Sequence, residues 1–502
     1  MTDANILLLA IAIPALTPFV VAALGSRPNL RDGASVIASL ATFAAVLTLL
    51  DGVIGGARPA ITLLEVMPGL VLRFEIEPLG MLFATVASGL WIATAVYSIG
   101  YMRGANEKNQ TRFYICFAIA IAAALGIAFS GNLFTLFIFY EVLTISTYPL
   151  VAHKETPEAR KGARIYLAIL MTTSILFLLV AVIWTWNIAG TMDFRAGGIL
   201  EGKIDPAYVP FLLALFAFGI GKAALMPFHR WLPAAMVAPT PVSALLHAVA
   251  VVKAGVFTML KVGTYIFGVG FLGKTGAADW LMWLAAASIL IASLVAVTKD
   301  DLKARLAYST VSQLSYITLG VALANQMGVI GGSMHIVMHA MGKITLFMCA
   351  GAIYVAAHKT KVSELDGLGR KMPITFICFT LAALSIIGLP PFGGAWSKWY
   401  LMLSAAEADQ LVIIGVLMVS SLLNVAYLLP IPARAFFAPA RGQVAHSLGA
   451  AAAPVREGIE EAPLLCLIPI CATAIGCLIL FFTVGGLYEY LLSIPILPES
   501  LP

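Results

Sequence analysis

The sequence predicts an all-α, polytopic membrane protein with about fourteen transmembrane helices. First, 61% of its 502 residues are hydrophobic and only 11% are charged, whereas soluble domains carry about 25% charged residues. Second, the apolar segments are about 20 residues long, which is the length a helix needs to cross the hydrocarbon core. Third, a backbone inside lipid has to pair its own polar groups, so segments of this length are helices.

The apolar segments follow one another with short polar connections. We expect the spans at 6–24, 34–54, 79–97, 113–129, 133–151, 165–186, 209–228, 242–267, 280–298, 306–324, 328–357, 374–403, 411–436 and 464–487. The seventh and twelfth contain prolines or glycines and are expected to be broken, because proline removes a backbone donor. The eleventh is long for one straight helix and contains glycines, so we expect it to be irregular as well.

The basic residues are distributed unevenly over the connections. Of 30 lysines and arginines, 20 lie in connections after odd-numbered spans and 6, with Lys261 among them, after even-numbered spans. Cytoplasmic loops are rich in Lys and Arg, so both termini are expected on the outer side of the membrane. The other four are lysines within the spans, namely Lys222, Lys253, Lys343 and Lys398.

Ionisable residues within apolar spans predict a functional site, because they are costly in lipid and usually mark ion or proton paths. Glu141 is the acidic residue in the middle of an apolar run, NLFTLFIFYEVLTISTYPL. A desolvated lysine releases its proton more easily and a nearby carboxylate opposes this, so Glu141 and Lys222 together predict a proton-loading switch. The alternative is a static buried ion pair that holds two helices together.

The run HIVMHAMGKITLF places His335, His339 and Lys343 at successive i, i+4 positions, on one face of a helix. Groups that gain and lose protons at this spacing suit a relay through water. Satisfied core histidines and an HxxxH metal site are the alternatives, but no third metal ligand is near in sequence. The six cysteines all lie in apolar runs without CxxC spacing, so we expect no metal and no cofactor.

Two further spans contribute to the predicted relay. In the eighth, Ser243 and His247 share a face, while Lys253 points about 120° away from it. In the twelfth, IIGLPPFGGAWSKWYLM breaks the helix just before Lys398. We include His247, Lys253 and Lys398 in the relay, because unwound backbone at membrane depth is tolerated only inside protein or beside a wet cavity.

The two broken spans predict an internal symmetry. Lys222 and Lys398 each lie beside an interrupted helix, and interrupted segments at matching positions are typical of inverted repeats. We expect four parts, which are N-terminal helices in 1–112, a first five-helix repeat in 113–267, a second in 278–437, and a C-terminal helix in 438–502. His153, His358 and His446 lie in charged connections and are expected to be solvated.

The run GKAALMPFHRWLPAAMVAPTPVSALLHAVAVVKAG, at 221–255, resembles the signature of antiporter-like, proton-conducting membrane subunits. These occur in respiratory complex I, in membrane-bound hydrogenases and in multisubunit Mrp sodium/proton antiporters, and the resemblance extends over roughly 75–430. It implies that Glu141 and Lys222 form the coupled pair. It also implies that Lys253 and the two histidines of the eleventh span lead to a terminal charged residue, here Lys398.

The length, the WSKWYL run and the number of spans are most similar to the D subunit of the Mrp antiporters. The resemblance thus implies a transporter subunit rather than an enzyme, in a prokaryotic cell (inner) membrane, with other membrane subunits as partners and protons and sodium as cargo. Nucleic acid is not an expected partner. The alternatives are a proton-pumping subunit of complex I or a hydrogenase, and a non-transporting scaffold. Pro149, eight residues after Glu141, departs from the family pattern and is expected to kink the fifth span, which changes the distance from Glu141 to Lys222.

Overall fold

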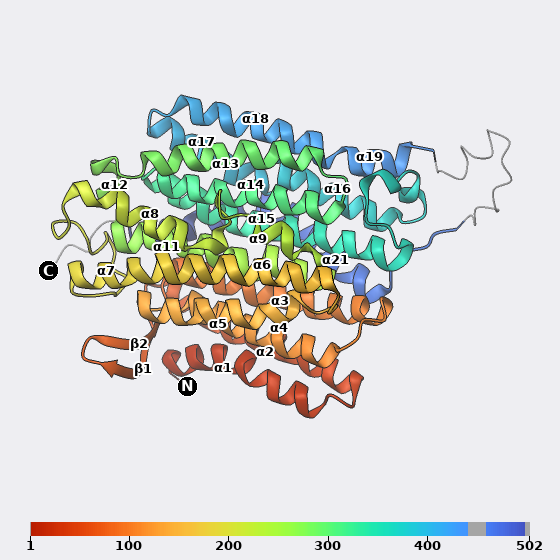
Figure 1. Ribbon diagram of the computed structural model, residues 1–502, viewed down its shortest axis with the longest axis horizontal. Coiled ribbons are helices and arrows are strands. Elements are labelled where there is room, and N and C mark those ends of the chain that lie inside the picture. The colour runs from red at the N-terminus through yellow and green to blue at the C-terminus, as the bar shows by residue number, and fades with distance from the viewer. Residues whose placement is uncertain (1, 440–457, 497–502) are drawn as a thin grey trace.

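A computed structural model describes residues 2–439 and 458–496, and its helices run roughly parallel in one bundle (Figure 1). Eleven helices in the described part are long and apolar enough to cross a membrane, and two shorter apolar helices accompany them. The predicted polytopic helical fold is therefore confirmed. Residues 440–457 and 497–502 of the predicted C-terminal part, and with them His446, lie outside the described residues.

The first part of the chain contains three long helices and one hairpin. The helices are α1 (Asp3–Ala23), α2 (Pro28–Ile54) and α3 (Pro78–Gly104), and the strands are β1 (Ala60–Met67) and β2 (Leu70–Glu75). The strands pair antiparallel, with Ala60 opposite Glu75 and Met67 opposite Leu70. This hairpin adds one small sheet to the predicted helical architecture, because Pro68 and Gly69, which has φ +81°, form a tight turn between two strands.

The next part holds the first broken helix. Its elements are α4 (Gln110–Ala128), α5 (Leu133–Val151), α6 (Pro157–Thr173), η1 (Ser174–Leu178), α7 (Leu179–Ala189), η2 (Pro206–Tyr208), α8 (Val209–Gly219), η3 (Gly221–Ala223), α9 (Trp231–Ala234), η4 (Ala235–Val237), α10 (Thr240–Ala244), η5 (Leu245–Val249), α11 (Val251–Val262), η6 (Gly263–Phe267) and α12 (Val269–Thr275). After α8 the chain makes one 3₁₀ turn, η3, and then irregular turns up to α9. This places Lys222 in non-α backbone.

The last part holds the second broken helix. Its elements are α13 (Asp279–Thr298), α14 (Leu302–Ala322), α15 (Gln326–Ala357), η7 (Val362–Glu364), η8 (Leu368–Arg370), α16 (Pro373–Ile387), α17 (Gly394–Glu407), α18 (Leu411–Leu428), α19 (Pro430–Phe437), α21 (Leu464–Phe482) and α22 (Val484–Leu492). Between α16 and α17, Gly388 adopts φ +90°, a conformation that favours glycine. Lys398 follows in the second turn of α17.

Helix α15 corrects one expectation, because it is a continuous α-helix of 32 residues rather than an irregular span. Its glycines serve close packing instead of interruption. A Cβ at Gly328 would lie 2.2 Å from the Gly320 carbonyl oxygen of α14, and one at Gly351 would lie 2.1 Å from the Tyr97 hydroxyl. The Asn325 side chain caps the first turn by accepting from the Gly328 N–H at 2.8 Å.

The bundle has a buried centre and two opposite faces. Residues 240–267 are almost all shielded, as is most of α15, whereas α1, α2, α18 and α21 expose many large apolar side chains. We call the end of the bundle that carries the β1–β2 hairpin the hairpin face; it lies at the left of Figure 1. We call the opposite end, where the turns after α5, α13 and α15 gather, the lysine face.

Candidate functional site

Lys222 lies fully buried where the first broken helix meets α5. Its ammonium donates to the Tyr140 carbonyl oxygen at 2.8 Å and to the Thr144 hydroxyl at 2.5 Å, and it lies 3.2 Å from the centre of the Tyr140 ring. Its backbone N–H donates to the Tyr140 hydroxyl at 3.0 Å. All these partners are neutral, so the charge is held by dipoles and a ring face rather than by a counter-ion.

Glu141, next to Tyr140 on α5, is the predicted partner of Lys222. Its two carboxylate oxygens are shielded from solvent and have no hydrogen-bond partner. No ion pair within 4.0 Å joins Glu141 to Lys222 in the described structure. The Glu141 carboxylate and the Lys222 ammonium are therefore not paired, which we call the open arrangement. The lysine is bound instead by backbone and hydroxyl groups of α5.

Tight backbone packing fixes the position of Lys222. A Cβ at Gly255 of α11 would lie 2.3 Å from the Lys222 carbonyl carbon and 2.3 Å from the Ala223 nitrogen. Only glycine lets the 3₁₀ turn approach α11 this closely. The Trp231 indole N–H donates to the Gly221 carbonyl oxygen at 2.9 Å and holds the turn from the other side.

The centre of the site joins α11 to α15. The Lys253 ammonium nitrogen lies 2.6 Å from His339 Nδ1, and both side chains are buried. The His339 and His335 rings are stacked with their centroids 5.8 Å apart, as their i, i+4 spacing predicts. His335 Nδ1 in turn lies 2.9 Å from the Ser397 hydroxyl of α17.

Lys398 ends this row beside the second break. Its ammonium donates to the Ile387 carbonyl oxygen at 2.8 Å, at the end of α16, and to the Ser421 hydroxyl at 3.1 Å. It also lies 5.3 Å from the centre of the Tyr316 ring, which stacks on His335. Like Lys222, it is held by a freed carbonyl group, a hydroxyl and an aromatic face.

Lys343 and His247 occupy separate positions near this row. The Lys343 ammonium turns toward α14, where it donates to the Ser309 hydroxyl at 2.6 Å and to the Leu306 carbonyl oxygen at 3.3 Å. It makes no direct hydrogen bond to His339. His247 lies in π-helical η5 with its ring 4.4 Å from that of Phe347, and neither ring nitrogen has a hydrogen-bond partner.

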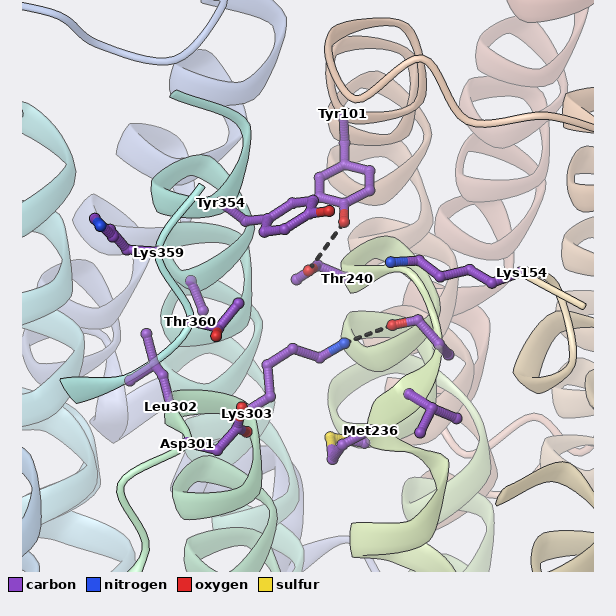
Figure 2. A pocket seen from close by; sticks show the side chains of 13 residues that line it. Tyr101, Lys154, Met236, Thr240, Asp301, Leu302, Lys303, Tyr354, Lys359 and Thr360 are labelled. Carbon is purple, nitrogen blue, oxygen red and sulfur yellow. Dashed lines mark hydrogen bonds between the residues drawn. The ribbon is translucent and has the colours of Figure 1, made fainter. Parts of the chain in front are cut away.

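A pocket opens at the lysine face, and Thr240 is among the residues that line it. Its volume is about 140 Å³, and Figure 2 shows the basic side chains of Lys154, Lys303 and Lys359 around it. Lys303 donates to the Ala238 carbonyl oxygen at 2.5 Å, and Thr240 lies at the inner wall. Thr240, Ser243 and His247 follow at helical spacing, so they lead from this pocket toward the centre.

Two polar positions differ from the sequence-based expectations. His153 was expected in solvent but is 4% exposed, and burial lowers its pKa to about 4, with the Arg112 charge contributing. Lys261, grouped above with the loop cations, is fully buried in α11. It pairs with Glu77, which sequence reasoning missed, at 3.2 Å. The signal available was the expected eighth span itself, 242–267, which contains Lys261.

The geometry brings most of the predicted residues into two connected groups. One group is Lys222 with the open Glu141 carboxylate, and the other runs from Lys253 through His339, His335 and Ser397 to the surroundings of Lys398. Lysine, imidazole and hydroxyl groups at these distances can pass protons along hydrogen bonds and bridging waters.

Comparisons with known proteins identify relatives of this chain. The family model described as NADH:quinone oxidoreductase/Mrp antiporter, transmembrane, matches residues 130–424. "NADH-quinone oxidoreductase subunit N" of Desulforudis audaxviator is 33% identical over 441 residues, which cover 86% of this chain and 85% of that protein. A protein of Rhizobium meliloti described as a component of a probable potassium/proton antiporter is 33% identical over 345 residues, which cover 68% of this chain but 33% of that longer protein.

Two solved structures show the same fold. A chain of the Mrp complex from Dietzia sp. DQ12-45-1b superposes with a TM-score of 0.86 at 24% identity, covering 99% of this chain and 97% of that one. A chain of the membrane-bound sulfane sulfur reductase, an archaeal respiratory membrane complex, gives a TM-score of 0.85 at 24% identity, covering 98% of this chain and 97% of that one. The chain has buried lysines at two helix breaks, a Lys–His contact between them and a family match over more than half its length. It belongs to the family of antiporter-like, proton-translocating membrane subunits.

Proposed function

We propose that this chain is the proton-translocating subunit of a multisubunit Mrp-type antiporter that exchanges sodium for protons. The observation that carries the proposal is the 2.6 Å contact between Lys253 and His339. It links the part of the chain that holds Lys222 to the part that holds Lys398, across the most deeply buried region of the bundle. A static scaffold has no need of buried cationic groups in such a row.

The first step of the proposed mechanism is a change at Lys222. In the described state its ammonium is bound to Tyr140 and Thr144, and Glu141 stands apart. Movement of Glu141 toward Lys222 stabilises the ammonium, and movement away favours release of one proton from Nζ. Because Gly255 packing and the Trp231 bond hold η3 in place, the change in distance comes from the Glu141 carboxylate, whose oxygens have no partner.

The released proton then passes along the second group. Lys253 Nζ donates to His339 Nδ1, and the other ring nitrogen of His339 gives up a proton toward His335, so each imidazole returns to neutrality. We propose that a water bridges the two rings, whose centroids are 5.8 Å apart. His335 then passes the proton through Ser397 toward Lys398, which has to be a neutral amine to accept it, and His247 feeds the row from the pocket at the lysine face. Lys343 sets the local positive field without a direct bond to His339.

The arrangement also fits two inverted repeats, 113–267 and 278–437, each with one broken helix beside a lysine. Further membrane subunits of the complex are the expected partners. In this proposal the complex as a whole transports sodium.

A second candidate function is a proton-pumping subunit of a redox-driven complex. Similarity to NADH-quinone oxidoreductase subunit N over most of both chains favours it. The two candidates share the proton path and differ in what drives it. Sodium-driven proton movement in vesicles of the purified complex, without any redox substrate, supports the antiporter, and movement that requires electron transfer supports the second candidate.

The path itself is tested by Glu141→Ala and Lys222→Ala, each measured by dye quenching in inverted vesicles. We expect both to abolish exchange while the complex still assembles on native gels. Glu158→Ala and Lys161→Ala are matched controls, because both side chains are exposed at the lysine face. Unimpaired exchange in Lys222→Ala would show that the chain is a scaffold.

A further inference from the structure

A second buried cation lies on α11, outside the row described above. The Lys261 ammonium donates to the Ser130 carbonyl oxygen at 2.7 Å and pairs with Glu77 Oε1 at 3.2 Å. The Phe194 ring centre lies 4.5 Å from it and that of Phe257 lies 5.4 Å away. The lysine is fully buried, so its charge is confined to one position at the end of α11.

Glu77 is held as a fixed counter-charge. It accepts from the Leu79 N–H at 2.7 Å and the Gly80 N–H at 2.9 Å, as the N-cap of α3. It also accepts from the Tyr265 hydroxyl at 2.9 Å. Together with Lys261 these are four donors, which hold the Glu77 carboxylate in one position beside the ammonium.

A pocket at the hairpin face reaches this ion pair. It has a volume of about 460 Å³, and its lining includes Glu77, Ser130 and Tyr265, all of which belong to the network around Lys261. Two other ion pairs lie at this face, with Arg73 at 2.8 Å from Glu75 and Arg195 at 3.8 Å from Asp193. Arg58 lines the same pocket.

Lys253, a member of the proton path, lies on the same helix as Lys261. The two lysines are eight positions apart, which corresponds to about 12 Å of helix. Phe257 lies midway, and its ring is packed against that of Phe83 with centroids 4.9 Å apart. Along α11, the Phe257 ring and then the buried Lys261 ammonium therefore lie between Lys253 and the pocket at the hairpin face.

We propose that the Lys261–Glu77 pair is an electrostatic barrier that keeps protons on the path at Lys253 from escaping to the pocket at the hairpin face. The inference rests on the proposed function of the row, since a barrier needs a path to protect. A fixed positive charge repels a proton that approaches it, as in other channels that exclude protons. At about 12 Å and an effective dielectric of about 20, removing the Lys261 charge alone changes the local proton occupancy roughly tenfold, whereas the intact pair has a smaller effect because the Glu77 charge lies 3.2 Å from the ammonium.

The test compares Lys261→Met, Lys261→Arg and wild type in vesicles that contain the assembled complex. The measurement is the passive decay of an imposed pH gradient without sodium. We expect Lys261→Met to raise this leak about tenfold, and Lys261→Arg to leak like wild type and to retain sodium/proton exchange, because arginine keeps the charge but does not release its proton. The double variant Glu77→Gln/Lys261→Met leaves no unpaired buried charge and is expected to leak more than wild type but less than Lys261→Met, because it removes both charges of the pair.

Two results would overturn the barrier. If Lys261→Met and the double variant leak no more than wild type, the pair is structural. If Lys261→Arg loses exchange, Lys261 is itself a proton carrier. Lys222→Ala is measured in parallel, because intact exchange in that variant refutes the proposed path, whatever the Lys261 variants do.

Discussion

Gly255→Ala is the substitution that most directly tests how Lys222 is positioned. The new Cβ would lie 2.3 Å from the Lys222 carbonyl carbon, whereas ordinary contact begins at 3.4 Å. The backbone of η3 or of α11 has to move by the difference, about 1 Å. The ammonium of Lys222 now bonds at 2.5 and 2.8 Å, so such a shift breaks or lengthens both bonds.

A misplacement of about 1 Å at a reacting group lowers rates by roughly a hundredfold. We therefore expect Gly255→Ala to reduce sodium/proton exchange by about two orders of magnitude, while overpacking costs roughly 1–3 kcal/mol of stability. Exchange is measured by dye quenching in inverted vesicles, and assembly by native electrophoresis. Gly415→Ala on α18 is the matched control, since its Cβ meets no atom within 4 Å. Wild-type exchange in an assembled Gly255→Ala complex would refute the argument that close packing places Lys222.

Two further predictions concern single contacts. Ser397→Ala removes the 2.9 Å contact with His335 and, at roughly 0.5–1.5 kcal/mol for a hydrogen bond, should slow exchange about two- to tenfold. Ser288→Ala, a buried serine whose hydroxyl has no partner, should not slow it. His153→Gln should flatten the loss of thermal stability of the solubilised complex at acid pH. Burial lowers the pKa of His153 from 6.5 to about 4, so its contribution is complete above pH 6.5 and falls as the pH drops toward 4. An unchanged melting profile between these pH values would contradict the assignment.

Much of the fold could be predicted because hydrophobic length is a local property of the sequence. The breaks beside Lys222 and Lys398 are equally local, since prolines and glycines interrupt a helix wherever they occur. The hairpin at 60–75 escaped prediction because its strands are apolar and lie between membrane helices. The continuity of α15 could not be read from its glycines, whose role depends on the partner helix that they meet.

The candidate site likewise has parts that the sequence predicts and parts that it does not predict. The Lys253–His339 contact connects residues 86 positions apart, and no spacing rule specifies it. The row of His335 and His339 follows from helical periodicity alone. Glu77 and Lys261 were missed because their pairing joins the first turn of α3 to the last of α11, 184 positions along the chain. The open Glu141 carboxylate depends on the turns after α8, which sequence reasoning does not resolve.

Because α15 is uninterrupted, it limits which parts of the protein can move during transport. His335, His339 and Lys343 lie on one continuous helix, which also carries Tyr354 at the lysine face. The distances between their backbone positions are therefore constant. A transport cycle therefore cannot change the backbone distances between these three residues of α15. The movements of the transport cycle therefore have to involve the interrupted segments on either side of α15. These are the region of η3 with Lys222 on one side and residues 388–393, just before Lys398 on α17, on the other.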